Sequence, residues 1–287
     1  FLGMGAASAY LTRYCLAVAN TTMQKDLDIS EEQMGWVFAI FSAGYFFFQI
    51  PGGWLGNRIG TRTAYPLIST LWSVLTVWSS LVWSWVPLLA SRAAFGAAQA
   101  GMVPITAKVI NDWFSVRLRG ICSGVIGASM SIGSVITMKL TAWLIGSGGL
   151  GIHWRVVFRL YSVVGIVWAI LFYWFFRTKP EQHPWIPSDK PDPVISDLSD
   201  EKSTDAIDVE IERHDVERPR ELTTGDLLIR IFTNQTLWGI NFQSFCRAAG
   251  YGLFVTWFPA FLEYRFGMSI GKAGEMTMYP LATGIVG

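Results

Sequence analysis

Eight apolar segments, most of them about 20 residues long or longer, follow one another along this chain, and no other feature limits its fold as strongly. They comprise residues 1–20, 34–56, 64–86, 88–110, 121–145, 155–176, 236–262 and 273 onward. A helix needs about 20 apolar residues to cross the hydrocarbon core of a bilayer. Hydrophobic residues make up 52% of the chain and charged residues 15%. The sequence therefore predicts an all-α membrane protein with about eight transmembrane helices.

The charges are distributed unevenly and divide the chain into three parts. Residues 180–235 hold 14 of the 21 acidic residues but six of the 22 basic ones, and they are rich in proline and poor in aromatic residues. This composition is typical of a disordered linker. We expect an N-terminal six-helix bundle at 1–179, an acidic cytoplasmic linker at 180–235, and the start of a C-terminal bundle at 236–287. The chain begins with Phe and ends inside an apolar segment, so we expect a piece of a longer protein.

Basic residues in the short connections predict how the helices are oriented. They follow the second, fourth and sixth apolar segments: Arg58, Arg62, Arg117, Arg119, Arg177 and Lys179. Positive residues in short loops stay on the cytoplasmic side. These three connections and the amino terminus are therefore predicted to be cytoplasmic, in a multi-pass protein of the inner or plasma membrane.

The second segment ends in a glycine-rich stretch, "GYFFFQIPGGWLGNRIGTR", at residues 44–62. It resembles the signature of the loop between helices 2 and 3 in the major facilitator superfamily. Its glycines allow close helix packing and a tight turn, and its arginines suit an anionic membrane surface. Asn57 stands where this signature usually has an acid. The residues that the resemblance assigns to a conformational role are Gly53, Asn57, Arg58, Gly60 and Arg62.

Three further stretches, "YLTRY", "RAAFGAAQAGMVP" and "SFCRAAGYGLFVTWFPAFL", resemble the anion:cation symporter family. This family includes hexuronate and galactonate transporters, sialin and vesicular glutamate transporters. The resemblance implies twelve helices in two halves, of which the last ones are missing here, and it implies organic-anion binding by Arg13, Arg92 and Arg247. Proton-coupled members carry acids where this chain has Thr12 and Gln99. We therefore expect weak or absent proton coupling.

Arg13 lies near the middle of the first apolar segment, where a charge costs roughly 2.5–3.5 kcal/mol on insertion scales. Outside the linker, all seven acidic residues lie in loops or near segment ends. A substrate carboxylate would supply the missing counter-charge, and a planar guanidinium suits it. Two alternatives stay open at this point. Arg13 and Arg247 would cap helix carbonyls or brace a kink, and Arg92 would extend to the extracellular edge.

Several uncharged polar residues are candidates for the same site. Gln99 follows Arg92 by seven residues, or two helical turns, and is predicted to line the same cavity, with a hydrogen bond between helices as the alternative. Tyr10, Tyr45 and Asn241 would hydrogen-bond a polyhydroxy substrate, with helix packing as the alternative for each. If the two halves are related by a pseudo-two-fold axis, Arg13 and Arg247 would face each other across one cavity.

The predicted function is secondary transport of small organic anions, such as sugar acids, by alternating access. A non-transporting anion sensor and a uniporter or antiporter of the same fold are the alternatives. The partners expected are the substrate anion, the lipid bilayer and a co-transported ion, but no nucleic acid, and the protein is expected to be a monomer. No cofactor, metal site or enzymatic activity is expected, because the three histidines lie outside the apolar segments and no nucleophile is paired with a base.

Overall fold

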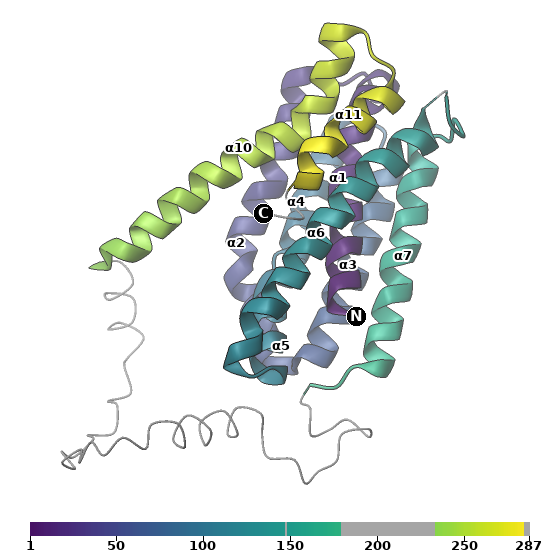
Figure 1. Ribbon diagram of the computed structural model, residues 1–287. Coiled ribbons are helices and arrows are strands. Elements are labelled where there is room, and N and C mark those ends of the chain that lie inside the picture. The colour runs from purple at the N-terminus through teal and green to yellow at the C-terminus, as the bar shows by residue number, and fades with distance from the viewer. Residues whose placement is uncertain (147, 179–232, 284–287) are drawn as a thin grey trace, which may run out of the picture. The chain divides into compact units, whose positions relative to one another are not determined.

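The computed structural model describes residues 1–146, 148–178 and 233–283, and every regular element in these ranges is a helix (Figure 1). The helices are α1 (Leu2–Leu27), α2 (Glu31–Ile59), α3 (Thr61–Leu81), α4 (Trp85–Gln99), α5 (Met102–Trp113), α6 (Val116–Ile145), α7 (Trp154–Phe175), α10 (Gln235–Phe266) and α11 (Ile270–Thr283). Each of the eight predicted segments coincides with helix. The predicted linker lies, apart from residues 233–235, outside the described residues.

The fourth predicted segment, 88–110, falls within one membrane-spanning stretch, Trp85–Trp113, but this stretch has an interruption that the sequence analysis did not predict. Helix α4 ends at Gln99, and α5 begins at Met102. Pro104 has no backbone N–H, and its ring interferes with the carbonyl four residues earlier, which belongs to Ala100. Ala100 and Gly101 keep right-handed helical backbone angles, so the hydrogen-bond ladder is interrupted without a turn of the chain. Gly101 lies against α2: a Cβ on Gly52 would lie 2.5 Å from the Gly101 Cα atom.

Polar residues set the ends of the first helices. Helix α1 runs about two turns beyond its predicted end and stops where Asp28 takes a left-handed conformation, with φ 51°. Ser30 and Gln33 then form a capping box that starts α2: the Ser30 hydroxyl accepts from the Gln33 backbone N–H, and the Gln33 side chain accepts from the Ser30 N–H. Gly60, with φ 79°, makes the turn between α2 and α3.

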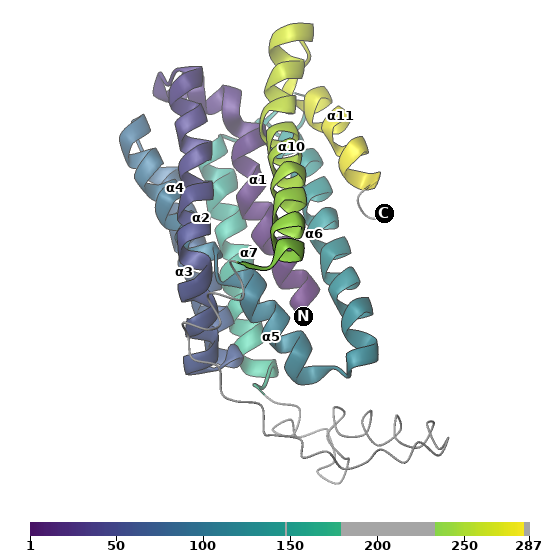
Figure 2. The same cartoon turned by 90° about the vertical axis from the view of Figure 1, so that its left-hand side faces the viewer.

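Of the described residues, those up to 178 and those from 255 to 283 belong to one compact unit, and those from 233 to 254 belong to another. In the first unit α1 packs on α6 and α7, α2 on α4 and α5, α3 on α7 and α4, and α11 on α6 (Figures 1 and 2). Small residues allow α2 and α4 to approach closely. A Cβ on Gly96 would collide with the Phe41 carbonyl, and a Cβ on Gly44 with the Ala93 carbonyl. These contacts set Phe41 and Tyr45 beside α4.

Four helical stretches among the described residues are long and apolar enough to cross a membrane: Glu31–Ile59, Trp85–Trp113, Val116–Ile145 and Trp154–Phe175. Large apolar side chains are exposed along the surface of α2 and α7, including Phe46, Ile50 and Trp174. A soluble protein would bury such side chains, whereas lipid tails solvate them. The interior is instead rich in serine and threonine, with Ser69 and Ser73 fully buried between α3 and α7.

Candidate functional site

Arg13 lies on α1, and three aromatic rings surround its guanidinium. The Cζ atom lies 4.9 Å from the ring centroid of Tyr10, 5.0 Å from that of Phe41 and 4.9 Å from that of Tyr45. Tyr10 precedes Arg13 on α1, while Phe41 and Tyr45 occupy successive turns of α2. The rings stabilise the cation through their negative faces. Two of the three sequence candidates for hydroxyl contacts, Tyr10 and Tyr45, are therefore at this site, and Phe41 joins them.

Gln99, the last residue of α4, holds the guanidinium in place. The Arg13 Nε atom donates a hydrogen bond to Gln99 Oε1 at 2.6 Å, and Gln99 Nε2 donates to the Ala9 carbonyl at 2.9 Å. Its side-chain orientation is thereby determined, because the flipped amide would set two donors against each other. Gln99 is fully buried.

The sequence predicted that Gln99 shares a cavity with Arg92, but its amide joins Arg13 instead. Two helical turns separate Gln99 from Arg92 by about 10 Å along α4, which is more than the two side chains bridge when both point sideways. The Gln99 side chain reaches α1, where it bonds both the Arg13 guanidinium and the Ala9 carbonyl. The pairing therefore depends on helix packing rather than on spacing within one helix.

One terminal nitrogen of Arg13, Nη2, is buried and has no hydrogen-bond partner within the described part of the chain. Neither Arg13 nor Arg92 forms an ion pair with an acidic side chain there. Thr12, the residue beside Arg13, directs its hydroxyl to the α1 carbonyls of Ser8 and Ala9. The site thus presents a positive charge with an unused donor and no carboxylate of its own, an arrangement suited to an incoming anion.

Arg92 is enclosed in the helix bundle and does not extend to a surface. It is 1% exposed, and its Cζ atom lies 5.1 Å from the ring centroid of Phe95 and 5.7 Å from that of Phe158. Its Nε and Nη2 atoms are buried without a hydrogen-bond partner among the described residues. The alternative that Arg92 reaches the edge of the membrane is therefore wrong. Aromatic rings of α4 and α7 separate it from solvent.

Arg247 and Asn241 lie in the first half of α10, where both side chains are exposed. This half belongs to the separate compact unit that contains residues 233–254, whereas Arg13 belongs to the other unit. A shared cavity between Arg13 and Arg247 stays a prediction.

The glycine-rich stretch forms the end of α2 and the start of α3. Arg58 places its Cζ atom 4.9 Å from the ring centroid of Trp54. Arg62 donates from Nε to the Tyr173 carbonyl at 3.1 Å and lies 4.8 Å from the ring centroid of the same residue, which ties α3 to α7. A Cβ on Gly53 would lie 3.1 Å from Pro104 Cβ, so this glycine lets α2 pack on α5.

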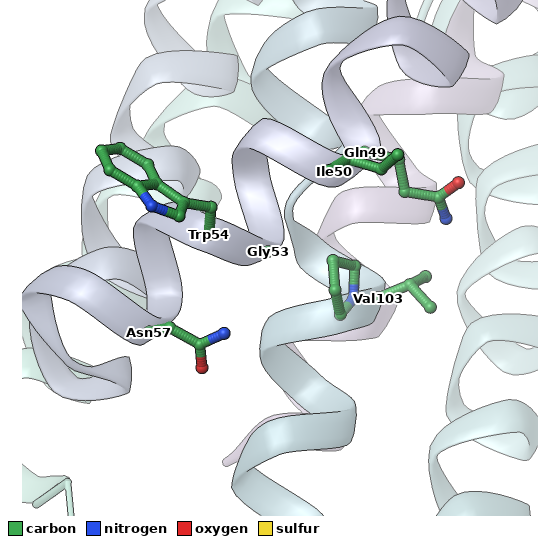
Figure 3. Close-up of a pocket in the computed structure, with 7 residues that line it drawn as sticks. Gln49, Ile50, Gly53, Trp54, Asn57 and Val103 are labelled. Atoms are coloured by element: carbon green, nitrogen blue, oxygen red, sulfur yellow. The ribbon is translucent and has the colours of Figure 1, made fainter. Parts of the chain in front are cut away.

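Asn57 lines a surface pocket between α2 and α5, with a volume of about 520 Å³. Figure 3 shows the side chains of Gln49 and Asn57 projecting from α2 toward the same side, with Val103 below Gln49 and Trp54 on the other side of the helix. The lining residues are Gln49, Ile50, Gly53, Trp54, Asn57, Val103 and Pro104. No acidic residue is among them.

The family model described as Major Facilitator Superfamily matches residues 2–287, nearly the whole chain. The chain belongs to the Major Facilitator Superfamily. Members of this superfamily are integral membrane transporters, which agrees with the fold, the exposed apolar surfaces and the resemblance of residues 44–62.

Two curated transporters and one solved structure are similar to this chain. The hexuronate transporter of Escherichia coli K12 is 27% identical over 278 residues, covering 97% of this chain and 60% of its own length. The galacturonate transporter of Dickeya chrysanthemi is 25% identical, covering 97% of this chain and 74% of its own length. A bacterial homolog of the human lysosomal transporter Spinster, in an inward-facing and unoccupied conformation, shares the fold with a TM-score of 0.71 and 19% identity, covering 98% of this chain and 58% of that one.

The chain thus spans about 60% of the length of the first of these curated relatives. Sequence reasoning had missed Phe41 and the Ala9 carbonyl as parts of the Arg13 site. The four-residue spacing of Phe41 and Tyr45 set both rings on one face of the predicted helix, a signal that points to Phe41 once Tyr45 is chosen. No sequence signal points to the Ala9 carbonyl, because every residue has one.

Proposed function

We propose that this protein is a secondary transporter of small organic anions, sugar acids foremost, that works by alternating access. One observation carries the proposal. Three aromatic rings surround the Arg13 guanidinium, its Nη2 atom has no hydrogen-bond partner, and it forms no ion pair with an acidic residue in the described part of the chain. The hexuronate and galacturonate transporters among the relatives support a sugar acid as the anion. The inward-facing fold relative is a transporter as well.

In this proposal, the residues around Arg13 have different roles in binding the sugar acid. Gln99 occupies the Nε side of the guanidinium, so a carboxylate approaches the terminal nitrogens. A hydrogen bond to a charged group contributes about 1.5–3 kcal/mol. Tyr10 and Tyr45 supply hydroxyls beside the cation for the sugar's own hydroxyls. We propose Arg247 and Asn241 as further anion-binding and hydroxyl-binding residues, contributed by the second half of the transporter.

We propose a different role for Arg92 than for Arg13. Because Phe95 and Phe158 enclose it, we assign it to the packing of the bundle behind the site rather than to direct contact with substrate in this conformation.

The Arg13 site contains no group that titrates in place of the acids of proton-coupled relatives. Gln99 and Thr12 are both neutral at every pH. A side chain that exchanges no proton cannot link transport to a pH gradient. We propose that the substrate gradient, a counter-ion or the membrane potential drives transport, and that the substrate carries the charge that neutralises Arg13.

We further propose the placement of the protein in the inner or plasma membrane as a monomer, with the amino terminus in the cytoplasm. The positive residues of the short connections support this orientation. In this arrangement residues 1–179 form the N-terminal bundle, residues 180–235 the cytoplasmic linker, and residues 236–287 the start of the second bundle. The residues of the glycine-rich stretch then lie at the cytoplasmic surface, where Arg58 and Arg62 face anionic lipid headgroups.

The test uses the purified full-length protein. D-galacturonate and D-galactonate should raise its melting temperature, whereas D-galactose, which lacks a carboxylate, should not. Arg13→Gln should weaken the effect of the sugar acids about 10- to 100-fold, as expected for loss of 1.5–3 kcal/mol. Arg117→Gln, at an exposed arginine on α6, is the matched control and should bind normally.

Flux in proteoliposomes completes the test. Uptake of radiolabelled galacturonate that saturates and depends on Arg13 supports transport, and binding without flux identifies a sensor. Unchanged binding by Arg13→Gln would refute the anion site.

A further inference from the structure

The pocket between α2 and α5 contains two carboxamides without a protein partner. Neither the Gln49 nor the Asn57 side chain forms a hydrogen bond, ion pair or ring contact within the described residues. Gln49 also falls inside the predicted membrane segment 34–56. An amide that faced lipid there would lose several kcal/mol of hydration without compensation. The side of α2 that carries Gln49 therefore faces water, a polar ligand or a part of the protein outside the described residues.

The two amides are arranged along one face of α2. They are eight residues apart, which is slightly more than two helical turns, and Figure 3 shows both projecting toward the same side. Each carboxamide carries two donors and one acceptor, as neighbouring hydroxyls of a sugar also both donate and accept. The pocket's volume of about 520 Å³ is within the usual range for small-molecule sites.

Charge and aromatic surface near the pocket favour a sugar acid over a neutral or cationic ligand. Trp54 forms one edge, and the Arg58 guanidinium lies 4.9 Å from its ring centroid. No carboxylate lines the pocket. The cation at the rim attracts an anion, and the indole offers an apolar surface to the C–H groups of a sugar ring.

The pocket follows the Arg13 site along α2. Tyr45, which stacks on Arg13, precedes Gln49 by four residues, or about 6 Å along the helix. We propose that the α2–α5 pocket, with Gln49 and Asn57 as its hydroxyl-binding groups, is a second subsite for hydroxyl-bearing sugar acids on the path between Arg13 and the cytoplasm. This inference rests on the proposed transport function.

The first experiment tests protection of the pocket in inside-out membrane vesicles of the full-length protein. Gln49→Cys is introduced after Cys15, Cys122 and Cys246 have been replaced by alanine, and a membrane-impermeant thiol reagent is applied. D-galacturonate should slow labelling at least threefold, whereas hexanoate, a carboxylate without hydroxyls, should not. Asn111→Cys, at an exposed position of α5 outside the pocket, should be labelled equally with and without galacturonate.

The second experiment measures efflux from the cytoplasmic side. Gln49→Leu and Asn57→Leu should each raise the half-saturating galacturonate concentration about fivefold, and Asn111→Leu should leave it unchanged. Arg13-dependent galacturonate binding without protection at Gln49→Cys would overturn the subsite and leave the transport proposal standing. A Gln49→Cys that the reagent never reaches would show that another helix or lipid occupies the pocket, which also overturns it. Absence of any sugar-acid binding would overturn both proposals.

Discussion

Arg13 on α1 donates a hydrogen bond from Nε to Gln99 Oε1 on α4, with 2.6 Å between the two atoms. The two residues are 86 positions apart in the chain. The bond joins a cation to a neutral amide. A carboxylate in place of the Gln99 amide would have formed an ion pair with Arg13 inside the protein. Within the described residues, no carboxylate therefore neutralises the positive charge of Arg13.

Gln99→Glu should turn Arg13 into one half of an internal ion pair. At neutral pH the new carboxylate competes with the substrate anion, and we expect galacturonate affinity to fall at least tenfold, equivalent to about 1.4 kcal/mol. Acidification protonates Glu and releases Arg13, so affinity should recover as the pH falls. Uptake at clamped membrane potential over a range of pH measures this. Gln99→Leu, which cannot titrate, is the control, and an equal pH response in both variants would contradict the prediction.

Arg92→Met should leave the protein folded and should hold or raise its melting temperature. Arg92 is a buried cation with two nitrogens that lack partners among the described residues, and a well-packed apolar side chain often replaces such a charge at no loss or with a gain of about 1–4 kcal/mol. Thermal unfolding monitored in detergent measures the effect. A marked fall in melting temperature would show that the charge has a compensating partner.

Gly52→Ala should destabilise the contact between α2 and α5. The added Cβ would lie 2.5 Å from the Gly101 Cα atom, and backbone cannot move aside as a side chain can. We expect a loss of about 1–3 kcal/mol. Gly124→Ala on α6 is the matched control, because nothing lies within 4 Å of its Cβ, and alanine should there gain up to about 1 kcal/mol from helix propensity. Equal melting temperatures for the two variants would count against the packing argument.

Thr21→Val combined with Tyr264→Phe should loosen the contact between α1 and the end of α10. The Thr21 hydroxyl donates to Glu263 Oε2 at 2.8 Å, and the Tyr264 hydroxyl donates to Gln24 Oε1 at 3.0 Å. The two substitutions remove both hydrogen bonds and almost no volume.

Reactivity of a cysteine at Ala39 reports this change, since Ala39 lines a pocket with Trp257 of α10. Labelling in the background without native cysteines should accelerate severalfold in the double variant. The control Thr106→Val removes the hydrogen bond to Tyr65 inside the first bundle and should not alter labelling. Unchanged labelling in the double variant would mean that the two bonds do not hold α1 and α10 together.

The helices could be located from sequence because the bilayer imposes their length and apolar composition locally. The end of α1 and the break between α4 and α5 were harder to predict from sequence, although each has a local cause. Polar residues extend α1 to Leu27, since a helix may continue beyond the hydrocarbon. Pro104 ends the hydrogen-bond ladder at Ala100, but prolines also occur inside α2 and α3 without a break, so proline alone did not decide the outcome.

The sequence by itself determined which residues carry unusual chemistry: a cation in an apolar segment is costly wherever it lies, so Arg13 and Arg92 were evident as candidates. Only the tertiary structure decided their different surroundings. Arg13 meets Gln99 because the fold sets the end of α4 within hydrogen-bond reach of α1, and it meets Phe41 because glycines bring α2 against α4. Arg92 is enclosed because α7 supplies Phe158. The free-energy cost of a charge in the membrane depends on one residue and its own segment. The contacts of that charge depend on residues from other helices, which only tertiary packing brings together.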